Sequence, residues 1–167
     1  SKGWAGATIS KEVDWSNCDA LQFYTIPDGN NQKVVVQITA NGKVYETYMN
    51  LYEKYAGKNT PMLVTIPFTD FCERDTTGNP KGGLVTDASK VTSFGLWVNA
   101  IASSPAVVDN KVSGTIYYDN ITAVKSGATK AVFKDLSKTD TTPTNPSNPS
   151  TDEEETKLVE QEALQIT

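Results

Sequence analysis

Two alternating runs of residues, separated by an Asn-Gly pair, constrain the fold of this chain more than any other feature. The runs are "KVVVQITA" (33–40) and "KVYETYMNL" (43–51), and Asn41 and Gly42 lie between them. Asn-Gly favours the positive φ angles of a two-residue type I′ turn, whose twist matches that of paired antiparallel strands. The sequence therefore predicts a β-hairpin here, with alternate side chains on opposite faces of a sheet.

The same signals predict further strands on both sides of the hairpin. Runs rich in β-branched and aromatic residues end at Gly, Pro and Asn turns. These runs are 3–10, 19–26, 61–68, 91–101 and 113–124, and 70–90 reads as a long polar loop. No segment of 1–124 has a convincing helical period. We predict an all-β fold, a two-sheet β-sandwich of the jelly-roll type.

The composition divides the chain into three parts. We assign residues 1–136 to the sandwich. Residues 137–155 form a linker of Thr, Pro, Asn and Ser that ends in acidic residues, without apolar side chains to bury. Residues 156–167 contain Leu164 and Ile166 two positions apart, as on one face of a strand. A short acidic helix or disorder is the alternative for this tail.

The negative charge is concentrated in the tail. The chain has 20 acidic and 15 basic side chains. Six of the acidic side chains and one of the basic ones lie in residues 152–167, so residues 1–151 contain 14 of each. Nucleic acids and anionic lipid surfaces attract basic patches. We therefore expect neither nucleic acid nor membrane as a partner, and a neutral ligand is compatible with this body.

Histidine is absent from the chain. This removes the commonest general base and the commonest metal ligand, so we expect a protein that is not an enzyme. The alternative is a small polysaccharide-degrading domain that uses a carboxylate pair. The candidate carboxylates are Glu12, Glu46, Glu53 and Asp70, and their spacing in the sequence favours no particular pair.

Cys18 and Cys72 allow either one disulfide or two free thiols.

A flat aromatic ring beside an amide suits a sugar, because pyranose rings have apolar faces and equatorial hydroxyl groups. In "FGLWVNA", Phe94, Leu96 and Val98 form a core set, while Trp97 and Asn99 lie on the opposite face. We predict that Trp97 and Asn99 bind a ligand. Packing of Trp97 in a second apolar layer is the alternative.

The hairpin adds three candidates by the same alternation. Gln37 faces away from the apolar set of its strand, and Glu46 and Tyr48 lie on the more polar face of the other strand. We expect these three side chains to line a cleft. Tyr52 and Tyr55, in the following loop, either form a wall of the cleft or cover the core. The apolar sets that define the core face are Val34, Val36 and Ile38, and Tyr45, Thr47, Met49 and Leu51.

Several blocks in this order resemble family 11 and related carbohydrate-binding modules. The blocks run from "GWAGATISKEVDWSNCDALQFYTI" through "TIPFTDF" and "FGLWVNAI" to "GTIYYDNITAV", over residues 3–124. Mannan-binding modules of neighbouring families share the scaffold. The resemblance implies a non-catalytic jelly-roll domain attached to plant-cell-wall hydrolases. It also places Trp4 where family 11 modules carry a binding tyrosine, although Trp4 could instead cover the core. Trp15 is expected to be a structural plug.

The resemblance also implies a structural calcium ion. An Asp in the "YYDNI" block helps to bind it in many modules of this scaffold, together with an acidic residue of the first strand. The matching positions are Asp119 and Glu160 or Glu162. Calcium needs six to eight oxygen ligands, which the sequence does not identify.

The chain departs from these modules at its start. They normally begin with a strand pair before the "GWAG" strand, and nothing corresponds to this pair upstream of Ser1. "KLVE" and "EALQIT" in the tail are similar to the two missing strands. Our hypothesis is a circularly permuted module in which the tail supplies them. The tail could instead insert into a neighbouring molecule or begin a tandem copy.

These observations give one main functional expectation. We expect a module that binds β-1,4-linked plant polysaccharide, meaning β-glucan, mixed-linkage glucan, xyloglucan or mannan, and thereby targets a covalently linked glycoside hydrolase. Linkers of this composition commonly join modules of secreted enzymes, so we expect an extracellular bacterial protein. A structural or adhesion sandwich without a sugar site is the other alternative, and it would bury Trp4 and Trp97.

Overall fold

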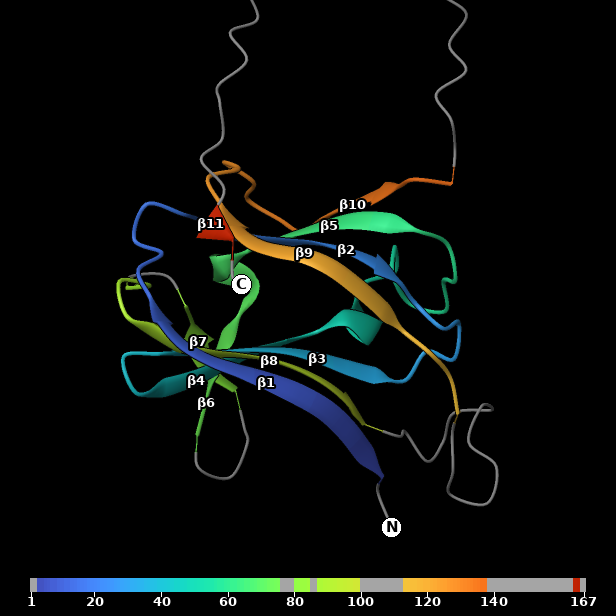
Figure 1. Ribbon diagram of the computed structural model, residues 1–167, viewed down its shortest axis with the longest axis horizontal. Helices are drawn as coiled ribbons and strands as arrows, with labels where there is room; N and C mark the ends of the chain where they lie inside the picture. Colours follow the sequence, from blue (N-terminus) through green and yellow to red (C-terminus); the bar gives the residue numbers. More distant parts are fainter. Residues whose placement is uncertain (1–2, 76–79, 85–86, 100–112, 138–163, 166–167) are drawn as a thin grey trace, which may run out of the picture.

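The computed structural model describes residues 3–75, 80–84, 87–99, 113–137 and 164–165. Its strands form two antiparallel sheets that face each other as the two layers of a sandwich (Figure 1). The predicted all-β, two-sheet fold is therefore confirmed. Helical structure in the described residues consists of two single 3₁₀ turns, η1 (Met49–Leu51) and η2 (Phe68–Asp70).

The first sheet, sheet A, has six strands in the order β1-β8-β3-β4-β6-β7. The predicted hairpin is β3 and β4, and its turn residues Asn41 and Gly42 have φ angles of 49° and 75°. These left-handed values are what an Asn-Gly turn requires. The strands of sheet A are β1 (Trp4–Val13), β8 (Val91–Asn99), β3 (Lys33–Ala40), β4 (Lys43–Tyr48), β6 (Cys72–Arg74) and β7 (Pro80–Gly83).

The second sheet, sheet B, has five strands in the order β10-β5-β2-β9-β11. Its central strands β5, β2 and β9 correspond to three of the predicted runs. Its edge strands are short, and sequence periodicity did not indicate β10. The strands of sheet B are β10 (Val132–Asp135), β5 (Met62–Pro67), β2 (Ala20–Ile26), β9 (Tyr117–Val124) and β11 (Leu164–Gln165).

The core lies between the two sheets and is built by alternation along their strands. Val34, Val36 and Ile38 of β3 are buried, as predicted, and oppose the β8 side chains of the same face. Trp15, just after β1, is fully buried and stacks on Phe68, with ring centroids 6.0 Å apart. Trp15 is thus the structural residue that the sequence predicted.

Three local features differ from the predictions or resolve them. The strand that begins at Lys43 ends at Tyr48, because the chain turns into η1 and leaves Leu51 74% exposed. The segment 70–90, predicted as a loop, contains the paired short strands β6 and β7. Cys18 and Cys72 are free thiols, so this structure contains no disulfide between them.

The tail contributes β11 to sheet B. Leu164 lies opposite Ala123 and Gln165 opposite Thr122, in antiparallel pairing with β9. Within the same chain, the tail therefore adds a strand to the sandwich that the body forms. The rest of 156–167 lies outside the described residues, and circular permutation stays a prediction.

Candidate functional site

Trp97 lies on the outer face of sheet A. Its cross-strand neighbours are Gly6 on β1 and Val35 on β3. Phe94 of the same strand, on the opposite face, is 4% exposed and belongs to the core. Trp97 therefore lies on the face opposite the core, as the alternation of the sequence predicted. Its ring is only partly buried.

Two glycines allow the indole of Trp97 to lie against the sheet. A Cβ atom on Gly95, two residues earlier, would lie 2.7 Å from Nε1 of Trp97. A Cβ atom on Gly6 would overlap the other end of the ring and would lie 2.5 Å from the carbonyl oxygen of Leu96. Contacts this short do not occur, so the position of the ring depends on both glycines. Nε1 of Trp97 is buried and makes no hydrogen bond.

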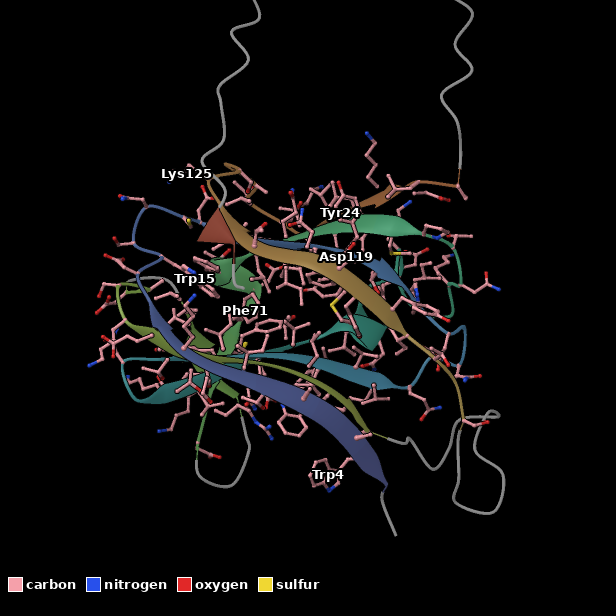
Figure 2. The ribbon with its side chains drawn as sticks, in the orientation of Figure 1. Trp4, Trp15, Tyr24, Phe71, Asp119 and Lys125 are labelled. Atoms are coloured by element: carbon pink, nitrogen blue, oxygen red, sulfur yellow. The ribbon has the colours of Figure 1, made fainter. Side chains whose placement is uncertain are left out.

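Trp4 packs against Trp97 from the neighbouring strand. The two ring centroids are 5.4 Å apart and the ring planes are inclined by 61°, an edge-to-face arrangement. Trp4 is 68% exposed and projects from sheet A on the side away from the core (Figure 2). It therefore does not cover the core, which was the alternative for this residue. Its cross-strand neighbour is Asn99.

A buried carboxylate organises the polar side chains beside the two indoles. Glu46 of β4 is 4% exposed. Its Oε1 accepts hydrogen bonds from Nε2 of Gln37 at 2.7 Å and from an Arg74 nitrogen at 2.6 Å. Its Oε2 accepts a hydrogen bond from the Tyr48 hydroxyl at 2.9 Å. Charge-assisted bonds of this kind offset the cost of burying the carboxylate and fix the side chains that donate them.

The same contacts shift the pKa values of the donors. Burial, followed by the hydrogen bond to Glu46, raises the pKa of the Tyr48 hydroxyl to about 12. Burial lowers the pKa of Arg74, but its hydrogen bond and ion pair with Glu46 outweigh this effect, and the net shift is upward. Tyr48 and Arg74 thus stay protonated near neutral pH. The ring of Tyr48 also lies under Lys33, whose Nζ is 4.0 Å from the ring centroid.

These side chains surround a shallow groove of about 260 Å³, which we call the Trp groove. Tyr48 does not line the Trp groove, but its hydroxyl donates a hydrogen bond to Glu46, which does. Glu46 is buried, and both of its oxygens accept hydrogen bonds, so its carboxylate holds the side chains of Gln37, Tyr48 and Arg74 in place. The lining residues are Trp4, Val35, Gln37, Glu46, Arg74, Trp97 and Asn99. Five predicted ligand-binding residues are thus brought together, and their binding role stays a prediction.

Sequence reasoning missed Arg74 and left Tyr52 and Tyr55 open. Arg74 belongs to the three-residue strand β6, too short to show a period of two. Tyr55 is 4% exposed, and the ring of Tyr52 lies 5.2 Å from that of Phe133. Both tyrosines cover the core, so the interpretation as a cleft wall is wrong. The reason is that β10 brings Phe133 against them.

The other candidate carboxylates lie elsewhere. Glu12 forms an exposed ion pair with Lys90, and Asp70 accepts a hydrogen bond from Tyr52. Glu53 is exposed in the loop after η1. Among the described residues that line the Trp groove, Glu46 is the single carboxylate.

Asp119, the described residue of the predicted calcium pair, is exposed on β9. Its Oδ1 accepts a hydrogen bond from the backbone N–H of Asn120 at 2.8 Å. The other candidates, Glu160 and Glu162, lie outside the described residues. Within the described part of the chain, no group of three acidic or thiol side chains is arranged to hold a metal ion. The calcium ion therefore stays a prediction.

Comparisons with protein-family models, with curated protein sequences and with solved structures gave no match to this chain. The resemblance to carbohydrate-binding modules thus rests on the quoted sequence blocks. No helix in the described residues is long and apolar enough to cross a membrane.

Proposed function

We propose that this chain is a non-catalytic carbohydrate-binding module, which holds a covalently linked glycoside hydrolase on β-1,4-linked plant cell-wall polysaccharide. The observation that carries the proposal is the edge-to-face pair of the 68% exposed Trp4 and the partly buried Trp97, which lies beside fixed polar side chains. The ligand is a neutral chain: β-glucan, mixed-linkage glucan, xyloglucan or mannan. The protein acts outside the cell, as part of a secreted enzyme.

The chemistry of the Trp groove fits a neutral sugar. The indoles offer apolar faces on which pyranose C–H groups can pack. Nε2 of Gln37 donates a hydrogen bond to Glu46, and this bond fixes the orientation of the Gln37 amide. The carbonyl oxygen of Gln37 can then accept a hydrogen bond from a sugar hydroxyl. Asn99 supplies a second amide at the Trp4 end of the groove. Arg74 and Glu46 neutralise each other, so the groove does not select a charged ligand.

The geometry favours single polysaccharide chains over the flat face of a crystal. Stacking on a flat crystalline surface requires aromatic rings that lie in one plane. The planes of Trp4 and Trp97 are inclined by 61°, so both rings cannot lie flat on one such surface. A single chain can present successive sugar rings at different tilts. We therefore propose soluble or amorphous polysaccharide as the target.

The two alternatives account for fewer of these features. A two-carboxylate hydrolase needs a second acidic group beside the scissile bond, and the described lining of the Trp groove has Glu46 alone, with both oxygens engaged. A structural sandwich has no need for an indole that is 68% exposed. Assay of reducing-sugar release from the same polysaccharides tests the first alternative.

The proposed mechanism is an increase in local concentration. A linked module that binds the polymer makes the encounter of the hydrolase with its substrate intramolecular. The Thr/Pro/Asn/Ser composition of 137–151 is suited to a spacer between modules. A structural calcium ion at Asp119 remains part of the expectation, and the binding mechanism does not require it.

Affinity electrophoresis in native gels tests the proposal. The gels contain, one at a time, soluble β-glucan, mixed-linkage glucan, xyloglucan, mannan and xylan. We expect retardation by at least one of them, and at least about a tenfold weaker affinity for Trp4→Ala and Trp97→Ala, since lost stacking and lost apolar contact add.

Leu51→Ala is the matched control, because Leu51 is apolar, 74% exposed and outside the lining of the groove. It should be retarded like the parent. If no polysaccharide retards the parent, the proposed function is wrong. If both tryptophan variants are retarded like the parent, the Trp groove is not the binding site.

A further inference from the structure

The outer face of sheet B carries a second group of exposed aromatic and apolar side chains. Tyr24 is 41% exposed, Ile26 37%, Tyr117 62% and Leu136 39%. Cross-strand pairing of β2 with β9 places Tyr24 opposite Asp119 and Ile26 opposite Tyr117. Phe23, adjacent to Tyr24 in the chain, faces the core and is fully buried. The exposed residues therefore share the face of sheet B that points away from sheet A.

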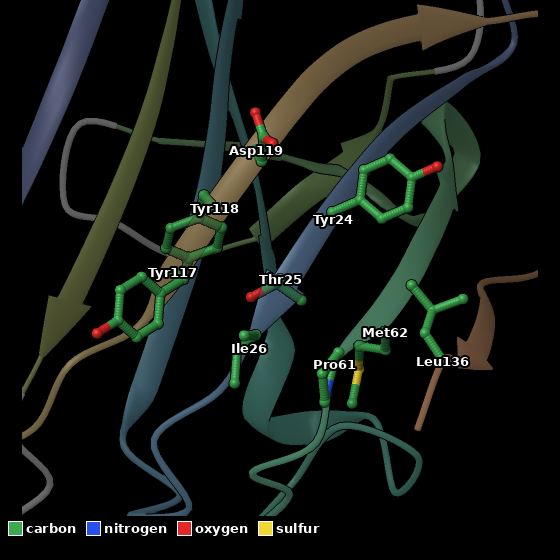
Figure 3. Close-up of a pocket in the computed structure, with 9 residues that line it drawn as sticks. All are labelled: Tyr24, Thr25, Ile26, Pro61, Met62, Tyr117, Tyr118, Asp119 and Leu136. Atoms are coloured by element: carbon green, nitrogen blue, oxygen red, sulfur yellow. The ribbon is translucent and has the colours of Figure 1, made fainter. Parts of the chain in front are cut away.

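These side chains border a groove of about 430 Å³, which we call the Tyr groove. Figure 3 shows Tyr24 and Tyr117 on two sides of it, with Ile26 nearer to Tyr117. It lies on the opposite side of the sandwich from Trp4, because Trp4 projects from sheet A and Tyr24 from sheet B (Figure 2). Its volume is in the range of small-ligand sites, and a stable protein interface generally needs a much larger surface.

The polar chemistry of the Tyr groove restricts the ligand. Asp119 provides an exposed carboxylate, and Oδ1 already accepts the Asn120 N–H, so Oδ2 can accept a hydrogen bond from a hydroxyl. The described residues that line the Tyr groove include no lysine or arginine. Phosphates and acidic glycans would therefore meet a carboxylate without a compensating cation. A neutral, hydroxyl-rich ligand with apolar faces complements the two tyrosine rings and the one acceptor.

We propose that the Tyr groove is a second binding site for a neutral β-linked glycan. Tyr24 and Tyr117 provide the stacking surfaces, and Asp119 accepts a hydroxyl. The ligand class rests on the proposed function, whereas the location does not. With grooves on opposite faces, one copy of the module holds two segments of polysaccharide. It then binds long polymers with avidity and bridges neighbouring chains.

Isothermal titration calorimetry of the full chain, in buffer with a chelator, tests this site. The probe is a short oligosaccharide of whichever neutral polysaccharide retards the parent in native gels. The parent is expected to bind two oligosaccharides per chain. The double variants Trp4→Ala/Trp97→Ala and Tyr24→Ala/Tyr117→Ala should each bind one, and their combination none. Asp119→Asn should weaken the second site alone.

Val132→Ala is the matched control, because Val132 is 49% exposed on sheet B and does not line the Tyr groove. It should keep both sites. All four tyrosine and tryptophan side chains replaced here are outside the core cluster, and thermal unfolding of each variant checks that it is folded.

The outcomes separate this inference from the proposed function. The parent could instead show a single site, which the tryptophan double variant loses and the tyrosine double variant keeps. The proposal for the Tyr groove is then wrong, and the proposed function stands. One site that disappears with the tyrosines alone supports the Tyr groove and overturns the Trp groove. If sedimentation shows that the parent is a dimer which the tyrosine variant dissociates, the groove is a self-association surface and the inference is wrong.

Discussion

Trp15 and Trp97 are the same residue type in the same sandwich, and their surroundings give them opposite roles. Trp15 is fully buried between the sheets and stacks on Phe68 with the rings 15° from parallel. Trp97 lies across Gly6 and Gly95 on the outer face of sheet A, in contact with an exposed Trp4. One ring fills volume in the core, whereas the other covers backbone and meets solvent.

The difference lies in the neighbours of each ring. A buried indole needs large apolar partners, and Trp15 has Phe68. An indole that lies on a sheet face needs neighbours without side chains, and Trp97 has two glycines. Aromatic residues are therefore assigned to core or surface by the side chains around them. Substitutions in both regions test this distinction.

Trp15→Ala should have the largest effect on stability. Removing a fully buried aromatic side chain costs about 3–5 kcal/mol through lost transfer energy and the cavity that remains. Urea denaturation followed by circular dichroism gives the change in the free energy of unfolding. Glycan affinity should be unchanged under conditions in which the variant is folded. A loss below about 1 kcal/mol would contradict the structural role of Trp15.

Glu46→Ala should reduce both stability and glycan affinity. The partly buried side chains of Gln37, Tyr48 and Arg74 lose their shared acceptor. A hydrogen bond to a charged group contributes about 1.5–3 kcal/mol, and the groove also loses its fixed polar side chains. Glu46→Gln keeps an acceptor oxygen and should recover part of the affinity. This conservative rescue, measured in affinity gels, distinguishes a residue that supports the binding site from one that contributes to stability alone. Equal affinity of Glu46→Ala and the parent would exclude either role.

Gly95→Ala should weaken glycan binding about tenfold with a small change in stability. The added Cβ would lie 2.7 Å from Nε1 of Trp97. The indole ring therefore has to move, although the Trp97 side chain itself is not replaced. A tenfold change corresponds to about 1.4 kcal/mol. Gly82→Ala is the matched control on the same sheet, because a Cβ there meets nothing within 4 Å. Equal binding of the two variants would show that the position of the indole does not matter.

Tyr48→Phe should change how stability depends on pH. The pKa of Tyr48 is raised to about 12 in the folded protein, against about 10 in an unfolded chain. Its contribution is therefore fully present below about pH 10 and is lost as the pH rises toward 12. Urea denaturation should give a smaller fall between pH 10 and 12 for Tyr48→Phe than for the parent. An identical fall in both proteins would contradict the raised pKa.

Part of this architecture could be predicted from sequence because it depends on local patterns. The Asn41-Gly42 turn and alternation along β3, β4 and β8 were enough to place Gln37, Glu46 and Trp97 on one face. The prediction failed where strands are too short to alternate, as in β6, which carries Arg74. It also failed for η1, where a single 3₁₀ turn ends β4 and exposes Leu51.

Features that need long-range pairing were also beyond the sequence. The Tyr groove depends on the register of β2 against β9, which shifts between Gln22 and Tyr24. Asn120 of β9 has a φ of 48° near this irregularity. The place of Trp97 depends on Gly6, more than ninety residues earlier in the chain. Such partners are set by packing of the whole sandwich, which local periodicity does not encode.

The claim that the outer face of sheet A binds the glycan can be tested with the three indole N–H signals in a proton–nitrogen correlation spectrum. The protein is titrated with an oligosaccharide of whichever neutral polysaccharide retards it in native gels. If the outer face of sheet A is the binding surface, the signals of Trp4 and Trp97 move with saturation while that of Trp15 stays in place. Saturating binding that leaves Trp4 and Trp97 unmoved would contradict the claim.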